Sequence, residues 1–241
     1  MNIENSVALI TGAGRGLGCA LVEAILTKSP RRVYVAARNP EQLQDLIYRY
    51  GDVIVPVVMD ITHPAEVQAV ANMARDVNLL INNAGVFSEG KILEAQETLI
   101  RRDMEVNYFG TLNVIRAFLP ILESHPGGAI VNILSISALA NVPSIGSYSA
   151  SKAASQSLTQ SIRSHLSKKF ISVHGVFPGP VDTDMTSRMN IPKADPLEVA
   201  HAILAGIEHG DEDIFPDGMS RQGGVSWRSN PKVLERQLAA T

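Results

Sequence analysis

The sequence predicts an α/β domain with a doubly wound parallel sheet, in which helices cover both faces of the strands. Its short apolar runs are nearly continuous in Val, Ile, Leu and Ala rather than alternating with polar residues. Such runs are typical of parallel strands that are buried on both faces. Longer helical patterns separate them, and this alternation implies right-handed crossovers between strands. We therefore expect a single three-layer αβα domain over residues 1–241.

Six apolar runs carry the strand pattern, and six helical patterns lie between and after them. The expected strands are Val7–Ile10, Arg32–Ala36, Val53–Met59, Asn78–Ile81, Ala129–Leu134 and Ser172–Phe177. The expected helices are Leu17–Thr27, Pro40–Tyr50, Pro64–Asp76, Ile92–Ile121, Tyr148–Lys169 and Pro196–Glu208. From about Gly210 the chain is rich in Gly, Pro, Ser and Asp. There we expect an irregular tail, with a short strand at Asp213–Phe215 and a last helical stretch at Pro231–Leu238.

Composition excludes several classes of protein. The 241 residues carry a formal net charge of −3, which gives no electrostatic footprint for nucleic acid or an anionic membrane. No run approaches about 18 consecutive apolar residues, and the first residues lack the basic segment of a signal peptide. The single cysteine, Cys19, cannot form an internal disulfide, and the six histidines show no metal-ligand spacing. We expect a soluble, cytoplasmic protein without a bound metal.

A glycine-rich loop follows the first expected strand and precedes an amphipathic helix. It reads Thr11-Gly-Ala-Gly-Arg-Gly-Leu-Gly18 and fits the spacing T-G-x-x-x-G-x-G rather than the strict G-x-G-x-x-G fingerprint. Glycines let the backbone approach a pyrophosphate closely, and the free N–H groups of the helix N-terminus then face that anion. The loop indicates a dinucleotide site, and the alternative is a structural turn without a ligand.

Tyr148 and Lys152 lie four residues apart, which places both on one face of a helix. A nearby ammonium group favours the phenolate, so we expect it to lower the tyrosine pKa from about 10 towards the working range. Ser135 follows the fifth expected strand, at the edge where a parallel sheet binds its ligands. Its hydroxyl can donate to the same substrate oxygen that Tyr148 protonates. In isolation, the Tyr–Lys pair also fits a solvated helix face.

Taken together, these motifs resemble those of the classical short-chain dehydrogenases/reductases, over essentially residues 6 to 210. The matching pieces are Thr11–Gly18, Asp60, Asn82-Asn83-Ala84-Gly85, Asn107 in Val-Asn-Tyr-Phe-Gly, Ser135, Tyr148-x-x-x-Lys152 and Pro178-Gly179-Pro180-Val181-x-Thr183. The resemblance implies a Rossmann fold and a nicotinamide cofactor.

The resemblance also implies catalytic roles for four residues. Tyr148 is the general acid/base, and Ser135 stabilises the substrate carbonyl. Ser135 is preferred to Ser137 because its separation from Tyr148 matches the family spacing. Lys152 binds the nicotinamide ribose and lowers the tyrosine pKa. Asn107 holds a water that feeds protons to Lys152, although a helix cap or kink is another interpretation of this asparagine.

The same resemblance carries over a set of cofactor-binding positions. They are Gly12, Arg15, Gly16, Leu17, Gly18, Arg38, Asp60, Asn83, Ala84, Gly85, Tyr148, Lys152, Pro178, Gly179, Val181 and Thr183. Asp60 is implied to contact the adenine ring, and Val181 and Thr183 to fix the nicotinamide amide. Taken alone, Asn82–Gly85 and Pro178-Gly179 are also typical of turns, and Asp60 of a helix N-cap.

The end of the second expected strand predicts the choice of cofactor. A carboxylate there bonds the adenosine 2′-hydroxyl of NAD, but the chain reads Ala36-Ala37-Arg38. Arg38, together with Arg15 in the glycine loop, is suited to clamp a 2′-phosphate. We expect NADP(H) rather than NAD(H), with two solvated surface arginines as the alternative.

The sequence therefore predicts an NADP(H)-dependent oxidoreductase, a carbonyl reductase or alcohol dehydrogenase acting on a small-molecule carbonyl or alcohol. One alternative is a catalytically silent cofactor-binding regulator or scaffold, which has no need of the complete catalytic set. Another is an epimerase or dehydratase, whose larger substrate domain does not fit within 241 residues. Small residues along Tyr148–Lys169 predict a homodimer across a two-fold axis. The tail departs from the family pattern, which leaves tetramer assembly open.

Overall fold

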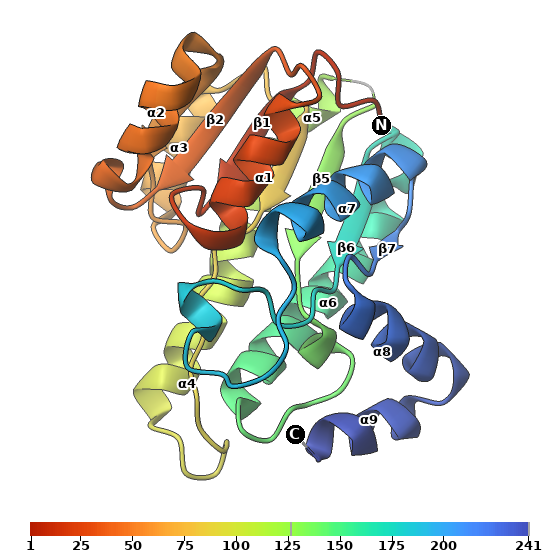
Figure 1. Cartoon of the computed structure of the whole chain (residues 1–241). Helices are drawn as coiled ribbons and strands as arrows, with labels where there is room; N and C mark the ends of the chain where they lie inside the picture. The colour runs from red at the N-terminus through yellow and green to blue at the C-terminus, as the bar shows by residue number, and fades with distance from the viewer. Residues whose placement is uncertain (126, 241) are drawn as a thin grey trace.

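Within residues 1–125 and 127–240, which the computed structural model describes, seven parallel strands form one sheet (Figure 1). Their spatial order is β3-β2-β1-β4-β5-β6-β7, with every neighbouring pair parallel. The strands are β1 (Val7–Thr11), β2 (Arg32–Ala37), β3 (Ile54–Val58), β4 (Leu79–Asn82), β5 (Ala129–Ile133), β6 (Ser172–Val176) and β7 (Asp213–Ile214). The predicted doubly wound fold is confirmed. The strand order reverses between β1 and β4, which is where such sheets open a ligand crevice.

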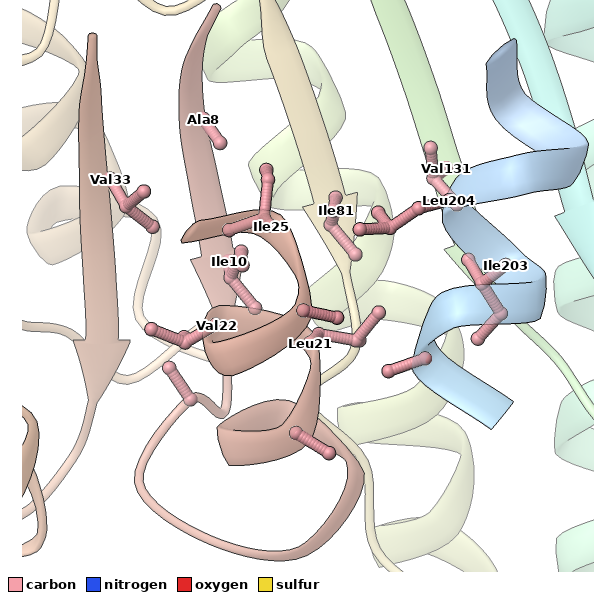
Figure 2. Packing of buried hydrophobic residues seen from close by; sticks show 14 of the residues in the cluster. Ala8, Ile10, Leu21, Val22, Ile25, Val33, Ile81, Val131, Ile203 and Leu204 are labelled. Carbon is pink, nitrogen blue, oxygen red and sulfur yellow. The ribbon is translucent and has the colours of Figure 1, made fainter. Parts of the chain in front are cut away.

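Helices α1 (Gly16–Leu26), α2 (Gln44–Tyr50) and α7 (Pro196–His209) cover one face of the sheet. Figure 2 shows Leu21 and Ile25 of α1 and Ile203 and Leu204 of α7 directed at the strands. All four side chains are fully buried. Burial of one such side chain stabilises the fold by roughly 1.5–3 kcal/mol, so this layer fixes how α1 leaves the glycine loop.

Helices α3 (Pro64–Met73), α5 (Thr111–Glu123) and α6 (Gly146–Leu166) cover the opposite face. Phe118 and Leu122 of α5 and Leu166 of α6 are buried against the strands of that face. The predicted single helix over Ile92–Ile121 is wrong in detail. The segment forms α4 (Glu97–Met104), a π-helical turn at Glu105–Gly110 and then α5.

The prediction of an irregular tail from about residue 210 is wrong in part. The expected strand at Asp213–Phe215 and the last helical stretch at Pro231–Leu238 are present, but the segment between them is largely helical. Beyond β7 the chain forms helix α8 (Gly218–Ser229) and helix α9 (Pro231–Ala239), which pack against each other (Figure 1). The glycines of α8 weaken its intrinsic helix propensity, but they permit close packing. A Cβ at Gly223 would lie 2.7 Å from the Ile136 side chain, and one at Gly224 would lie 2.8 Å from Phe215. Tertiary contacts therefore outweigh propensity in this helix.

None of the described helices combines the length and the apolarity needed to cross a bilayer.

Candidate active site

A cleft opens at the carboxyl ends of the strands, on both sides of the switch point between β1 and β4. All the residues predicted to bind a cofactor line this one cleft, from the glycine loop to Thr183. Of the four predicted catalytic residues, Tyr148 and Lys152 line it as well. Asn107 and Ser135 lie next to the cleft and contact residues that line it. Motifs that are far apart in the sequence therefore meet in one place.

The glycine loop turns sharply and leaves no room for side chains. Gly12 has φ +65°, and a Cβ there would lie 2.8 Å from the Ala84 backbone. A Cβ at Gly18 would lie 2.1 Å from the Gly12 carbonyl oxygen. No side chain caps the N-terminus of α1, and its first turn holds no acidic residue. The first amide groups of α1 therefore stay available for an anion in the cleft.

The turn after β4 is bonded directly to the glycine loop. The Asn83 side-chain amide donates to the carbonyls of Thr11 and Gly12 at 2.9 and 3.1 Å. The Thr11 hydroxyl accepts from the backbone N–H groups of Asn83 and Ala84, both at 3.0 Å. Asn82–Gly85 is thus a strand-ending turn that also forms the wall of the cleft.

At the β2 end of the cleft, two arginines each face a carboxylate at long range. Arg38 Nη1 lies 4.0 Å from Asp60 Oδ2, and Arg15 Nη1 lies 3.7 Å from Asp184 Oδ2. Both arginine side chains are about two-thirds exposed, so these ion pairs contribute little and exchange partners readily. Ala37, which is buried, stands where a carboxylate would face the ribose. This edge of the cleft therefore carries two arginines and two loosely paired carboxylates, and β2 itself contributes no acid to it.

The Asp60 carboxylate is held by its own loop, while the Asp60 backbone N–H donates to the Glu66 carboxylate of helix α3 at 2.8 Å. The Asp60 carboxylate accepts from the Thr62 backbone N–H at 2.9 Å and the Thr62 hydroxyl at 2.7 Å. Burial acts to raise the pKa of Asp60, but these bonds and the charge of Arg38 hold that pKa below its ordinary value. The alternative interpretation of Asp60 as an N-cap is wrong, because His63 occupies the N-cap position of α3.

Tyr148 and Lys152 lie on the first turns of α6, next to the end of β5. The Ser135 side chain lies close enough to the Tyr148 hydroxyl to lower the tyrosine pKa, and the Phe87 ring packs edge-on against the tyrosine ring. The Ser135 oxygen also accepts from the N–H and the hydroxyl of Ser137, at 3.2 and 3.0 Å. Ser137 thus orients the Ser135 hydroxyl, which lies beside the Tyr148 hydroxyl.

Burial is the main cause of the pKa shifts in this pair. It raises the pKa of Tyr148 to about 12, although the nearby Ser135 side chain lowers it and the charge of Asp103 raises it further. It lowers the pKa of Lys152 to about 8, while Asp103 acts to raise that value. The net shift of the Tyr148 pKa is therefore upward, so the predicted lowering is wrong. Lys152 Nζ donates to the Ile133 carbonyl at 2.8 Å and lies 5.7 Å from the tyrosine ring centre.

Asn107 lies in the π-helical turn and joins three elements. Its side chain accepts from the Val86 N–H at 2.9 Å and donates to the Val86 carbonyl at 3.0 Å and the Ser151 hydroxyl at 2.8 Å. Its backbone carbonyl accepts from the hydroxyls of Thr111 and Ser155. Asn107 therefore fixes the loop after β4 against α6, and its role in holding a water stays a prediction.

Helices α8 and α9, which together form the C-terminal hairpin, reach the site through Asp217. The sequence motifs did not indicate this residue. The Asp217 carboxylate accepts from the Gly179 N–H and from the Ser220 N–H, each at 2.8 Å. It therefore caps α8 and at the same time holds the loop that carries Pro178 and Val181 in the cleft wall. Only the Asp-x-x-Ser spacing of a capping box pointed to this residue in the sequence.

Several other lining residues were not predicted as cofactor contacts, and of these only Thr11, Gly14 and Val106 lie within a motif. The residues that were not predicted are Thr11, Gly14, Ala36, Ala37, Gln42, Met59, Ile61, Val86, Val106, Ile133, Leu134, Asp184, Met185 and Thr186. Most flank a motif residue and reach the cleft through the sheet edge. Gln42 comes from the segment after β2 and packs against Gly14, where a Cβ would lie 2.6 Å from it. Among the described residues, no group of three or more His, Cys, Asp or Glu side chains is arranged to hold a metal ion.

Comparison with known proteins shows which family has this architecture. The model of the short chain dehydrogenase family matches residues 6–194. An uncharacterized oxidoreductase of Staphylococcus aureus is 33% identical over 210 residues, which cover 84% of this chain and 90% of that protein. The crystal structure of a short chain dehydrogenase from Burkholderia cenocepacia in complex with NADP superposes with a TM-score of 0.93 at 42% identity and 99% coverage of both chains. A short chain dehydrogenase/reductase from Burkholderia phymatum in complex with NAD gives a TM-score of 0.87 at 25% identity, covering 98% of this chain and 96% of that one.

A doubly wound sheet with a glycine-lined cleft at its switch point is the architecture of dinucleotide-binding oxidoreductases. Within that class, the match over residues 6–194 is decisive. The chain belongs to the short-chain dehydrogenase family, as the sequence motifs predicted.

We predict that Asp217→Ala lowers the free energy of unfolding by about 2–3 kcal/mol, because two buried N–H groups lose a charged acceptor. Urea unfolding measures this change. Asp195→Ala is the matched control, since Asp195 caps α7 in the same way but bonds only its own helix. That control loses about 1 kcal/mol. Equal losses in the two variants would show that the bond to Gly179 contributes nothing.

Proposed function

We propose that this protein is an NADP(H)-dependent oxidoreductase that transfers a hydride between the nicotinamide ring and a carbonyl or secondary alcohol carbon. The observation that carries this proposal is the approach of the Tyr148 and Ser135 hydroxyl groups beside the cleft, with Lys152 one helical turn away. Two hydroxyl groups converge there on the position of a single substrate oxygen. A silent binding protein gains nothing from such an arrangement.

The cleft fits a dinucleotide. Side chains at Gly12 and Gly18 would collide with backbone, so the surface that faces the ligand is backbone amide. The uncapped N-terminus of α1 suits a pyrophosphate. The residues that would hold the cofactor are those predicted from the sequence, with the adenosine at Arg38 and Asp60 and the nicotinamide at Val181 and Thr183.

When bound, the nicotinamide supplies or accepts the hydride. Ser135 orients the substrate oxygen by a hydrogen bond, and the Tyr148 hydroxyl donates a proton to that oxygen during reduction. Lys152 brings a buried positive charge near the phenolate that forms, which favours the proton transfer. Asn107 holds the loop at Val86 in place, so the opposite wall of the site does not move during the reaction.

Turnover with NADPH is the direct test of this proposal. The protein is mixed with NADPH and a panel of aldehydes, ketones and quinones while the absorbance of the reduced ring is followed. Binding of NADPH without turnover on any of them would favour a regulatory or scaffold protein.

Tyr148→Phe is expected to reduce kcat by roughly 10²–10⁴-fold, because only the hydroxyl supplies the proton. The ring stays in place against Phe87, so the dissociation constant for NADPH should change less than about twofold. Steady-state kinetics and fluorescence titration with NADPH measure the two quantities. A variant that retains more than half of the wild-type kcat would refute the role of Tyr148.

The choice of NADP(H) rests on the two arginines at the edge of the cleft. Each is paired only loosely with a carboxylate, so a 2′-phosphate can recruit both without breaking a buried contact. The Burkholderia cenocepacia relative is described in complex with NADP and the Burkholderia phymatum relative with NAD. The higher identity of the first supports NADP(H) here.

We expect kcat/KM to be at least about tenfold higher with NADPH than with NADH, which is about 1.4 kcal/mol. The double variant Ala37→Asp with Arg38→Ala should erode or reverse that preference, because it adds repulsion to the 2′-phosphate and removes half of the clamp. Arg49→Ala is the control, since this arginine lies outside the cleft and pairs with Glu23. Equal use of both cofactors by the wild type would contradict the assignment.

We propose further that the protein is a homodimer. Ala150, Ala153, Ser157 and Ser161 on α6 are exposed, and Ala154 is half-buried. A strip of small side chains lets two copies of α6 approach closely across a two-fold axis.

Light scattering at micromolar concentration is expected to give twice the 25.9 kDa of one chain. Ala153→Arg should shift the mass towards one chain, because a two-fold axis would bring both new charges together. Ala69→Arg, on the exposed side of α3, should leave the mass unchanged. A wild-type mass of one chain would rule out the dimer.

A further inference from the structure

Asp103 is a buried carboxylate next to the catalytic helix. It lies on α4 and is completely shielded from solvent. Its two oxygens accept from the hydroxyls of Ser88 and Ser147, each at 2.7 Å. Within residues 1–125 and 127–240 no cation pairs with it directly. A buried charge without such a partner costs several kcal/mol, so its position calls for a functional reason.

The hydrogen bonds around Asp103 suit its ionised form. Arg102 Nη2 donates to the Ser88 oxygen at 3.0 Å, which directs the Ser88 hydroxyl hydrogen towards Asp103. Ser147 is the second residue of α6, where the positive end of the helix dipole favours a negative charge. Both Asp103 carboxylate oxygens therefore accept a hydrogen bond from a serine hydroxyl, and neither oxygen faces another hydrogen-bond acceptor.

The charge of Asp103 acts on both members of the catalytic pair. Ser147, which it bonds, directly precedes Tyr148 in the chain. Asp103 raises the pKa of Tyr148 and also that of Lys152, so it opposes proton loss from each. Among the residues that the structure describes, no other charged group acts on both residues in this way. The remaining titratable groups on elements that pack against α6 are Glu97, Arg101, Arg102, Glu105, Tyr108, Lys168, Lys169 and His174.

We propose that Asp103 is a positioning residue whose charge keeps the Tyr148–Lys152 pair protonated and thereby biases the site towards carbonyl reduction over alcohol oxidation. This inference rests on the proposed function. In reduction, the hydride of NADPH bonds to the carbonyl carbon while the C=O π pair moves to oxygen and takes the Tyr148 proton. NADPH is oxidised and the carbonyl is reduced. Alcohol oxidation has to start from the phenolate, and Asp103 lowers the fraction of enzyme that holds Tyr148 in that form before the reaction begins.

The first test is the pH dependence of kcat/KM in the reductive direction, for the wild type and Asp103→Asn. Reduction fails once the pair loses a proton, so the falling limb marks that loss. Asp103→Asn keeps the shape of the side chain and removes its charge. The falling limb of the pH profile is therefore expected to move to lower pH by roughly one unit. In alcohol oxidation, the rising limb should move in the same direction.

Arg102→Met gives a change of opposite sign and is the matched variant. Arg102 is exposed, so its loss should not prevent folding. Removal of this cation leaves the negative potential of Asp103 less compensated, so the limb should move to higher pH. If Asp103 had a purely structural role, both variants would show lower rates or lower stability. The limbs of their pH profiles would then stay at the wild-type positions. Unmoved limbs, or limbs that move the same way in both variants, would overturn the proposal.

An optical titration tests the same charge without turnover. The chain has five tyrosines, so subtracting the titration of Tyr148→Phe isolates the phenolate absorbance of Tyr148. In the Asp103→Asn background, the isolated absorbance should rise at lower pH than in the wild type. If the wild type binds NADPH but reduces no carbonyl, the proposed function fails, while this titration still decides whether Asp103 acts on Tyr148. An unchanged titration would refute the proposal even in an active enzyme.

Discussion

The site depends on one steric constraint, the contact of two backbone segments at the switch point of the sheet. Gly12 and Ala84 follow adjacent parallel strands, and a Cβ on Gly12 would lie 2.8 Å from the Ala84 Cα. The Thr11 hydroxyl and the Asn83 amide fasten the two segments together. Because the crossovers from β1 and β4 go to opposite faces, the chain must diverge from this contact, and the divergence forms the cleft. A side chain at Gly12 would separate the segments and displace both walls.

The second requirement is a rigid wall opposite Tyr148, and the π-helical turn meets it. A π turn inserts one residue into a helix and changes which groups face inward. Here it leaves the Asn107 carbonyl to accept the hydroxyls of Thr111 and Ser155, while the Asn107 side chain bonds the backbone at Val86. The loop after β4 is thus tied to α6, which carries Tyr148. Two segments that would otherwise move independently keep a fixed separation.

The sequence predicted those parts of the molecule that are encoded locally. Continuous apolar runs located the strands, and the motifs located five of the six glycines that line the cleft, with Gly14 missed. Asp103 and Asp217 were missed because their partners lie far along the chain: Ser147 is 44 positions from Asp103, and Gly179 is 38 positions from Asp217. Helix α8 was missed for a related reason. Its glycines oppose helix formation locally, and only contacts with Ile136 and Phe215 compensate. The Tyr148 pKa was predicted in the wrong direction because burial, which spacing does not reveal, is the largest cause of its shift.

The C-terminal hairpin connects the two loops that the chemistry needs. On one side, Gly223 of α8 packs against Ile136, which directly follows Ser135 in the chain. On the other side, Asp217 bonds Gly179 in the loop that lines the nicotinamide end of the cleft. Phe215 stacks on Phe177 between these contacts, with their ring centres 5.2 Å apart. A shift of the hairpin would therefore move the serine and the cofactor loop together rather than one at a time. Under the proposed function the substrate would fit between those loops, so the width of its space would depend on a segment that lies outside the family motifs.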